Sequence, residues 1–303
     1  MKSYTFPHSV IIAGVVRNCA KYLPQLLKKL EGIGNCFDKS HLIFVENDST
    51  DSTLKVLKEW EQGKSNREVI ALEPVETMLA RRTGRLAFAR NRYLERIEND
   101  PELSKYDYLL VTDMDDASQG LTPESIAACF EYPITDWEVM TANQTHLYYD
   151  IWTLRHPIWC PGDCFVEING RPDFITKDFL DHIAVGARMI SIPTNRGLIP
   201  VDSAFGGAAL YRLSFVKGCK YKGLYRKQTE VCEHVALNKQ LREKGARIFI
   251  NPRMINSDGV SWHAFHTAPP SVHIPPARCA NASINSPIAS SIKFSVSIQN
   301  ELR

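Results

Sequence analysis

Three aspartates stand within four positions at the end of a short apolar run: Asp113, Asp115 and Asp116. Residues 106–112 before them are typical of a buried strand, and a buried strand that ends in carboxylates is costly unless a positive charge binds there. Side chains two apart on a strand point the same way. If the strand continued, Asp113 and Asp115 would share one face and could hold a divalent cation bridged to a phosphate. The alternative is an acidic loop that caps the next helix, predicted over Pro123 to Phe130.

Polar turns also follow earlier apolar runs, at residue 17 and at residue 46. Between these runs lie segments whose leucines and arginines recur at helical spacing. This alternation of strands and helices predicts a doubly wound, mainly parallel sheet. Ligands bind such sheets at the carboxyl ends of the strands, so the turns at 17, 46 and 113 are expected to gather there. The strands predicted in this half are Ser9 to Val16, His41 to Val45, Glu68 to Leu72 and the run before Asp113.

A helix rich in arginine is predicted from about Thr83 to Ile97. Arg82, Leu86 and Arg90 are spaced to lie on neighbouring turns, so one or two guanidinium groups could reach a diphosphate while Leu86 packs inward. The alternative is that these charges form an ordinary solvated helix face.

Composition excludes few classes of protein. The chain has 303 residues, of which 44% are apolar and 23% charged, with a net charge of +2, as expected for a globular enzyme and without the basic excess of a nucleic-acid binder. No apolar run approaches 18 residues, so neither a transmembrane span nor a secretory signal is predicted. Eight cysteines show no paired zinc spacing. We therefore expect reduced thiols and a cytoplasmic location.

The second half of the chain has weaker periodicity. Residues 146–171 are irregular and rich in Trp, Tyr, Pro and Gly, which is typical of an acceptor groove or lid, or equally of a packed loop. Ala187 to Ile192 is a further candidate strand. The paired glycines at 206 and 207 permit close backbone approach. Further predicted elements are a strand over Trp137 to Thr141, a helix near Glu230 to Glu243, a strand over Arg247 to Ile250 and a Pro- and Ser-rich tail over 266–303.

Three motifs occur in an order that resembles the GT-A fold of nucleotide-sugar-dependent glycosyltransferases: residues 15–18 (VVRN), residues 46–51 (ENDSTD) and Asp113-Met114-Asp115. Residues 202–207 (DSAFGG) and 232–234 (CEH) are most similar to the fungal capsule-associated mannosyltransferase group and related microbial or viral enzymes.

The resemblance covers residues 9–265 and implies a Rossmann-like, mainly parallel sheet flanked by helices, with an irregular acceptor-side region. It implies a catalytic domain over 1–265, with a nucleotide-binding half (1–130) and an acceptor half (131–265), followed by the tail.

The resemblance also implies roles for individual residues. Mn²⁺ or Mg²⁺ would be held by Asp113 and Asp115, with His263, favoured over His266, completing the metal or phosphate site. The implied donor site comprises Val15, Arg17, Glu46, Asp48, Arg82, Arg90 and Asp113.

For the acceptor side, Glu233 is the candidate base if the reaction inverts the anomeric carbon, and it would position the sugar or acceptor if configuration is retained. Its alternative role is that of a first-turn helix glutamate. Asp202 is a second candidate catalytic acid, and Trp152, Gly206 and Gly207 are expected to contact the acceptor, although aromatic residues in this region could equally be core.

The predicted function is metal-dependent transfer of a sugar from a GDP- or UDP-sugar to a carbohydrate or glycoconjugate acceptor, with mannose suggested by the resemblance alone. A haloacid-dehalogenase-like phosphatase and a non-catalytic nucleotide- or carbohydrate-binding module are the alternatives. Residues 15–18 lack the Gly-x-Gly-x-x-Gly turn of dinucleotide oxidoreductases. No nucleic-acid partner is expected, whereas peripheral contact with a membrane is compatible with the sequence.

Overall fold

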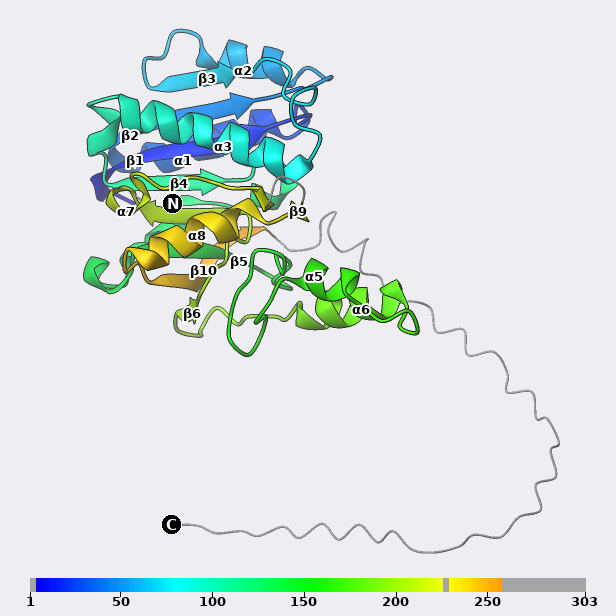
Figure 1. Cartoon of the computed structure of the whole chain (residues 1–303). Helices are drawn as coiled ribbons and strands as arrows, with labels where there is room; N and C mark the ends of the chain where they lie inside the picture. Colours follow the sequence, from blue (N-terminus) through cyan, green and yellow to red (C-terminus); the bar gives the residue numbers. More distant parts are fainter. Residues whose placement is uncertain (1–3, 226–228, 258–303) are drawn as a thin grey trace, which may run out of the picture. The chain divides into compact units, whose positions relative to one another are not determined.

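The computed structural model describes residues 4–225 and 229–257, and its centre is an eight-stranded sheet with the order β3-β2-β1-β4-β7-β5-β10-β6 (Figure 1). The strands of this sheet are β1 (Phe6–Val16), β2 (Phe37–Glu46), β3 (Arg67–Ala71), β4 (Tyr108–Thr112), β5 (Val139–Gln144), β6 (Ile199–Val201), β7 (Ala208–Arg212) and β10 (Ile248–Ser257). A separate two-stranded ribbon pairs β8 (Leu224–Tyr225) with β9 (Thr229–Glu230).

The strands β1, β2, β3 and β4 are parallel neighbours. Their register places Val16 of β1 beside Glu46 of β2, so the carboxyl ends of these strands meet at one edge of the sheet. Two strands run against this direction: β7 is antiparallel to both β4 and β5, and β6 is antiparallel to β10. The predicted α/β class, with a mainly parallel sheet flanked by helices, is confirmed.

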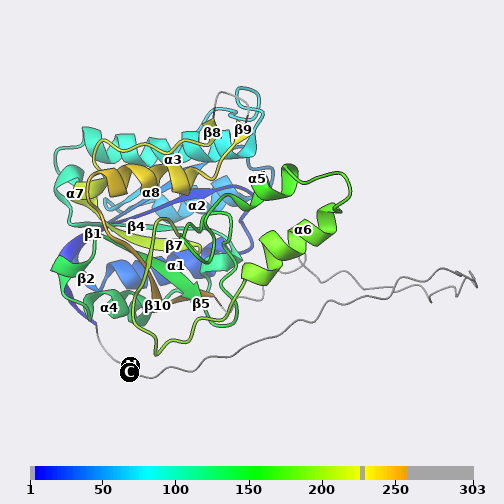
Figure 2. The ribbon, with the colours of Figure 1, turned by 60° about the horizontal axis from the view of Figure 1, so that its bottom comes forward.

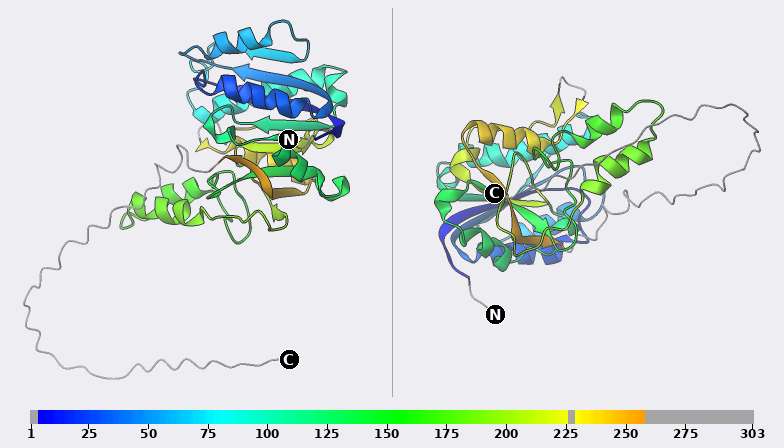
Figure 3. Two further views of the ribbon diagram at one scale, coloured as in Figure 1. Left: turned by 180° about the vertical axis from the view of Figure 1, so that it is seen from behind. Right: turned by 90° about the horizontal axis from the view of Figure 1, so that it is seen from below.

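Helices cover both faces of the sheet (Figures 1 and 3). Figure 1 looks onto the face that carries α3 and α8, and the left view of Figure 3 looks onto the face that carries α1. The helices are α1 (Leu23–Gly34), α2 (Thr53–Glu61), α3 (Arg82–Asn99), α4 (Pro123–Phe130), α5 (Cys164–Asn169), α6 (Lys177–Ala184), α7 (Leu213–Val216) and α8 (Glu233–Glu243).

Alternating side chains of the central strands supply two separate cores. Ile11 of β1 packs in the core that includes α3, α7 and α8, whereas its neighbour Ile12 packs in the core that includes α1, α2 and α4. Both side chains are completely buried. Strands buried on both faces are apolar without interruption, which is why these elements were visible in the sequence as continuous apolar runs.

The chain between β5 and β6 is mostly irregular and carries α5 and α6, which project from the body of the sheet (Figure 2). The strand predicted over Ala187 to Ile192 is wrong. Residues Gly186–Arg188 form a 3-10 helix instead, closed by a hydrogen bond from the Met189 amide to the Gly186 carbonyl. The segment has no neighbouring strand with which to pair among the residues that the structure describes.

Several predictions stay untested by the described residues. His263 and the tail over 266–303 lie outside them, and the division into a nucleotide-binding and an acceptor half stays a prediction. In the part of the chain that the structure describes, no helix combines the length and apolar character needed to cross a bilayer.

Candidate active site

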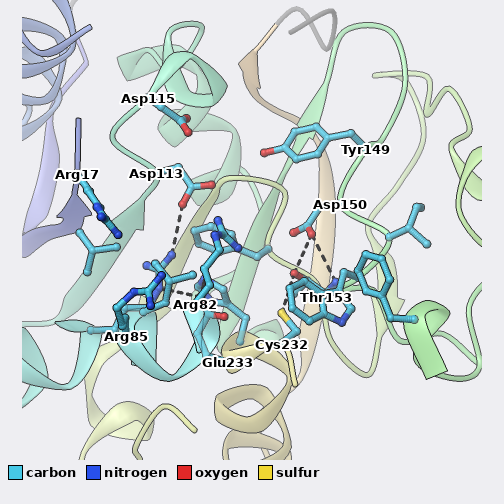
Figure 4. Close-up of a pocket in the computed structure, with 18 of the residues that line it drawn as sticks. Arg17, Arg82, Arg85, Asp113, Asp115, Tyr149, Asp150, Thr153, Cys232 and Glu233 are labelled. Atoms are coloured by element: carbon cyan, nitrogen blue, oxygen red, sulfur yellow. Dashed lines mark hydrogen bonds and ion pairs between the residues drawn. The ribbon is translucent and has the colours of Figure 1, made fainter. Parts of the chain in front are cut away.

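A cavity of about 930 Å³ opens at the carboxyl ends of β1 and β4 (Figure 4). Its walls include the end of β1, the turns after β1 and β4, the N-terminal half of α3, the first turn of α8, residues 149–153, and the helices α5 and α6. The structure therefore gathers segments that are more than 200 residues apart in the sequence. Eight predicted site residues line the cavity: Val15, Arg17, Arg82, Arg90, Asp113, Asp115, Trp152 and Glu233.

The two aspartates after β4 lie in a turn. Because β4 ends at Thr112, the expectation that Asp113 and Asp115 share a face of a continuing strand is wrong. The Asp113 amide donates to the Gly207 carbonyl at 2.8 Å, and the Asp115 carboxylate caps a 3-10 helix by accepting from the Ala117 amide at 3.0 Å. The turn still brings both carboxylates to the cavity (Figure 4).

The environment of Asp113 disfavours a bare negative charge. Burial raises the pKa of its carboxyl group to about 7, the charge of Asp115 adds to the rise, and Arg90 opposes it. Such a pair suits a divalent cation, which would remove the repulsion. Among residues 4–225 and 229–257, no group of three or more His, Cys, Asp and Glu side chains is arranged to hold a metal.

A buried arginine joins Asp113 to the start of α8. Arg90 Nη2 lies 3.3 Å from Asp113 Oδ1, and Arg90 Nε donates to Glu233 Oε1 at 3.1 Å. The guanidinium carbon of Arg90 lies over the rings of Phe205 and Tyr221, at 5.4 and 5.7 Å from their centroids. Arg90 and Glu233 are respectively 3% and 4% exposed, so this pair is closed to bulk water.

Three arginines, from the turn after β1 and from α3, form a basic wall of the cavity, which we call the arginine wall: Arg17, Arg82 and Arg85. Arg85 is oriented by its Nη1, which donates to the carbonyl groups of Leu79 and Ala80 at 3.0 and 2.9 Å. Arg17 forms an ion pair with Glu76 at 2.6 Å, and both side chains are partly exposed. Figure 4 shows these guanidinium groups on the same side of the cavity as Asp113.

The opposite wall contains an acid that the sequence did not reveal, Asp150. Its Oδ2 accepts from the Gly206 amide at 2.9 Å, and its Oδ1 accepts from the Thr153 hydroxyl at 2.8 Å. The Thr153 hydroxyl lies 3.2 Å from the Cys232 thiol, whose pKa is raised by burial. The thiol is therefore protonated and not a nucleophile at neutral pH. Asp150 was missed because it follows no strand and belongs to no periodic segment.

The predicted acceptor residue Trp152 lies on this second wall and is held rigidly. Its indole N–H donates to Asp163 Oδ2 at 3.1 Å, and its ring meets the edge of Phe165 at a centroid distance of 5.0 Å. Aromatic rings in fixed orientations provide faces on which sugars and other flat apolar surfaces stack.

Two predicted donor residues support the cavity from outside its lining. Glu46 ends β2, is buried, and accepts from the Ser49 amide at 2.9 Å. Asp48 has a positive φ of 53° and accepts from the amides of Val75 and Glu76 at 3.0 and 3.2 Å. The Asp48 contacts tie the turn after β2 to the loop before α3, the helix that carries Arg82 and Arg85 of the arginine wall.

Three predicted acceptor-side residues also lie outside the lining. Asp202 is half-exposed and pairs with Arg242 at 2.8 Å. Gly206 and Gly207 have φ angles of 64° and 86°, which disfavour a side chain. A Cβ atom on Gly207 would lie 2.7 Å from the Tyr149 hydroxyl, so this glycine allows β7 to approach the cavity wall.

Comparisons with known proteins give a likeness of fold only. No protein-family model and no curated protein matches the sequence. Solved structures similar to the chain include residues 1–349 of TarS from S. aureus (14% identity, TM-score 0.46) and the mannosyltransferase PcManGT from Pyrobaculum calidifontis in complex with GDP-Man and Mn²⁺ (14%, 0.47). A third is glucosyl-3-phosphoglycerate synthase from Mycobacterium tuberculosis with UDP (10%, 0.41).

These likenesses span most of the chain but only part of the other proteins. They cover 80%, 86% and 78% of this chain, in the same order, and 57%, 60% and 65% of the other chains. The chain therefore spans less than two thirds of the length of each of these structures.

Proposed function

We propose that the protein is a metal-dependent glycosyltransferase that moves a sugar from a GDP- or UDP-sugar to a carbohydrate or glycoconjugate acceptor. One observation carries the proposal: a single cavity at the carboxyl ends of parallel strands combines paired carboxylates, a basic wall and an opposite wall with a fixed aromatic ring and an acid. This arrangement matches the two chemical halves of a nucleotide-sugar reaction.

The donor half would be formed by Asp113, Asp115 and the arginine wall. A nucleotide sugar carries a diphosphate, which leaves with its negative charge when the glycosidic bond breaks. Arg82 and Arg85 would bind the phosphate oxygens, because guanidinium groups form paired hydrogen bonds with them. A divalent cation on Asp113 and Asp115, when bound, would neutralise the leaving group as a Lewis acid. The raised pKa of Asp113 supports this fit, since it shows that Arg90 does not fully offset the burial of this carboxylate.

The acceptor half would be formed by Trp152, Asp150 and Glu233. Trp152 would stack on a sugar ring, and Asp150 would accept hydrogen bonds from its hydroxyl groups. Glu233 would take the proton of the attacking hydroxyl if configuration is inverted, or hold the sugar in place if it is retained. The sugar, a relation to capsule mannosyltransferases and a cytoplasmic location stay predictions.

The test is isothermal titration of the purified full chain with UDP, GDP and CDP, in Mn²⁺ and then in excess chelator. We expect one nucleotide to bind in Mn²⁺ and to bind much more weakly in chelator. The matching nucleotide sugars are then incubated with the protein, and release of free nucleotide is measured by mass spectrometry. Absence of binding by all three nucleotides, together with phosphate release from simple phosphate esters, would instead support the phosphatase.

A further inference from the structure

Arg90 occupies a position that does not fit a simple ligand of phosphate. Its side chain is 4% exposed, and its guanidinium group lies within cation–π distance of the rings of Phe205 and Tyr221. Among the described residues, its Nη1 has no hydrogen-bond partner and is buried. Arg82, eight residues earlier on the same helix, is exposed at the cavity. The donor diphosphate is therefore within easier reach of Arg82.

The ion pairs of Arg90 connect two functions of the site. One carboxylate is Asp113, the proposed metal ligand, at 3.3 Å, and the other is Glu233, the proposed acceptor-side acid, at 3.1 Å. The Asp113 contact is the longer of the two and comes from the terminal Nη2, whereas the bond to Glu233 comes from Nε, nearer the backbone. One buried cation thus serves two acids, and its charge is shared between them.

We propose that Arg90 is a positioning residue that acts as the counter-ion of Asp113 until a divalent cation replaces it, and that it holds Glu233 in place throughout. The inference rests on the proposed function for the metal at Asp113. Arg90 and the metal compete for one carboxylate, so removing the charge of Arg90 strengthens metal binding. By linkage, metal binding releases Arg90 from Asp113 and leaves it fully to Glu233. Glu233 is thereby held most firmly when the donor site is loaded.

The competition predicts that replacing Glu233 and replacing Arg90 change the affinity for Mn²⁺ in opposite directions. In Glu233→Gln, Arg90 keeps only Asp113 as a charged partner, so Mn²⁺ should bind at least about fivefold more weakly. In Arg90→Met, the competing cation is gone, and Mn²⁺ should bind at least about fivefold more tightly. The double variant removes one charge of each sign and should return to within about twofold of the unmodified protein.

The measurement is titration of each full-length protein with Mn²⁺ alone at pH 8, with free Mn²⁺ followed by electron paramagnetic resonance. Glu138→Gln is the matched control, because Glu138 is also buried and paired with arginine, Arg247, but lies outside the cavity. It should lower stability towards urea without changing the affinity for Mn²⁺. A merely structural role of Arg90 would change stability but not produce the opposed affinities.

Titration with UDP and GDP in chelator separates this role from phosphate binding. Arg90→Met should leave nucleotide affinity unchanged there, and a clear loss would overturn the inference in favour of a phosphate ligand. Weaker Mn²⁺ binding by Arg90→Met, or unchanged binding by Glu233→Gln, would overturn it as well. If Arg90→Met does not fold, Glu233→Gln and the double variant decide.

Failure of the proposed function is distinguishable from failure of this inference. Mn²⁺ binding in the predicted order without binding of any nucleotide would refute the transferase and leave the inference standing. Metal-dependent nucleotide binding without the predicted order of Mn²⁺ affinities among the variants would refute the inference and leave the transferase standing.

Discussion

Replacing Asp113 by asparagine should stabilise the metal-free protein at alkaline pH. Burial and the charge of Asp115 raise the pKa of Asp113 from 3.8 to about 7. A tenfold change in proton affinity is worth about 1.4 kcal/mol, so ionising this group in the folded protein costs up to about 4 kcal/mol. Because 32% of the side chain is exposed to the cavity, solvent screening reduces the expected value to about 2 kcal/mol.

The sign of this effect depends on pH. A carboxyl group with a raised folded-state pKa supports the fold below its unfolded pKa, near 4, and this support is lost as pH rises towards 7. The Asp113→Asn variant carries an amide at this position, which does not titrate in this range. The two proteins should therefore have similar stability at pH 4, and the variant should be more stable at pH 8.

Urea unfolding in chelator at pH 4, 6 and 8 measures the difference, with Asp202→Asn as an exposed control. The extra stability of Asp113→Asn should grow with pH and should disappear when Mn²⁺ is added, because the cation stabilises only the unmodified protein. A variant that is less stable than the unmodified protein at pH 8, or a difference that does not change with pH, would refute the argument that Arg90 compensates the charge of Asp113 only in part.

Three further outcomes test the site and its surroundings. Asp115→Asn retains an oxygen that can cap the 3-10 helix, so stability should change by less than about 1 kcal/mol, whereas Mn²⁺-dependent nucleotide binding measured by calorimetry should fall at least about 100-fold. Asp202→Asn should leave that binding within about twofold of the unmodified protein, since Asp202 lies outside the cavity lining. Asp100→Asn should lower stability above pH 4 but not near pH 2 in acid titrations followed by circular dichroism, because a hydrogen bond from Arg96 holds the pKa of Asp100 at about 2 and the support is lost as pH falls through that value.

The parallel part of the fold could be predicted because its signals are local. β1, β2 and β4 each contain a run of apolar residues that ends at polar ones, and such runs are visible without knowledge of their partners. The position of β7 could not be predicted. It pairs with β4 and β5, roughly 100 and 70 residues earlier in the chain, and the sequence at residues 208–212 contains nothing that selects these neighbours. Its antiparallel direction follows from the path of the chain, which depends on packing.

The candidate site likewise contains residues whose position could be predicted from the sequence and one whose position could not. Val15 lies at the end of β1, and Arg17, Asp113 and Asp115 follow strands, so their approach to one sheet edge could be predicted from the alternation of elements. Asp150 could not be found, because its carboxylate is fixed by a hydrogen bond from the Gly206 amide, 56 residues later. A single residue in an irregular segment gains its place only from such distant contacts.

Two arginines on α3 show that residue type alone does not reveal the role of a side chain in the site. Arg82 and Arg90 are separated by eight residues, which places them about 80° apart around the helix and about 12 Å apart along it. Arg82 lies on the first turn and is exposed at the cavity, whereas Arg90 lies two turns further on, buried against Glu233 from α8. Glu233 is 143 residues away in the sequence, so the sequence could not distinguish an arginine that binds phosphate from one that neutralises buried acids. The partner that the fold brings to each guanidinium group, and not the spacing along the helix, therefore decides the role of each arginine.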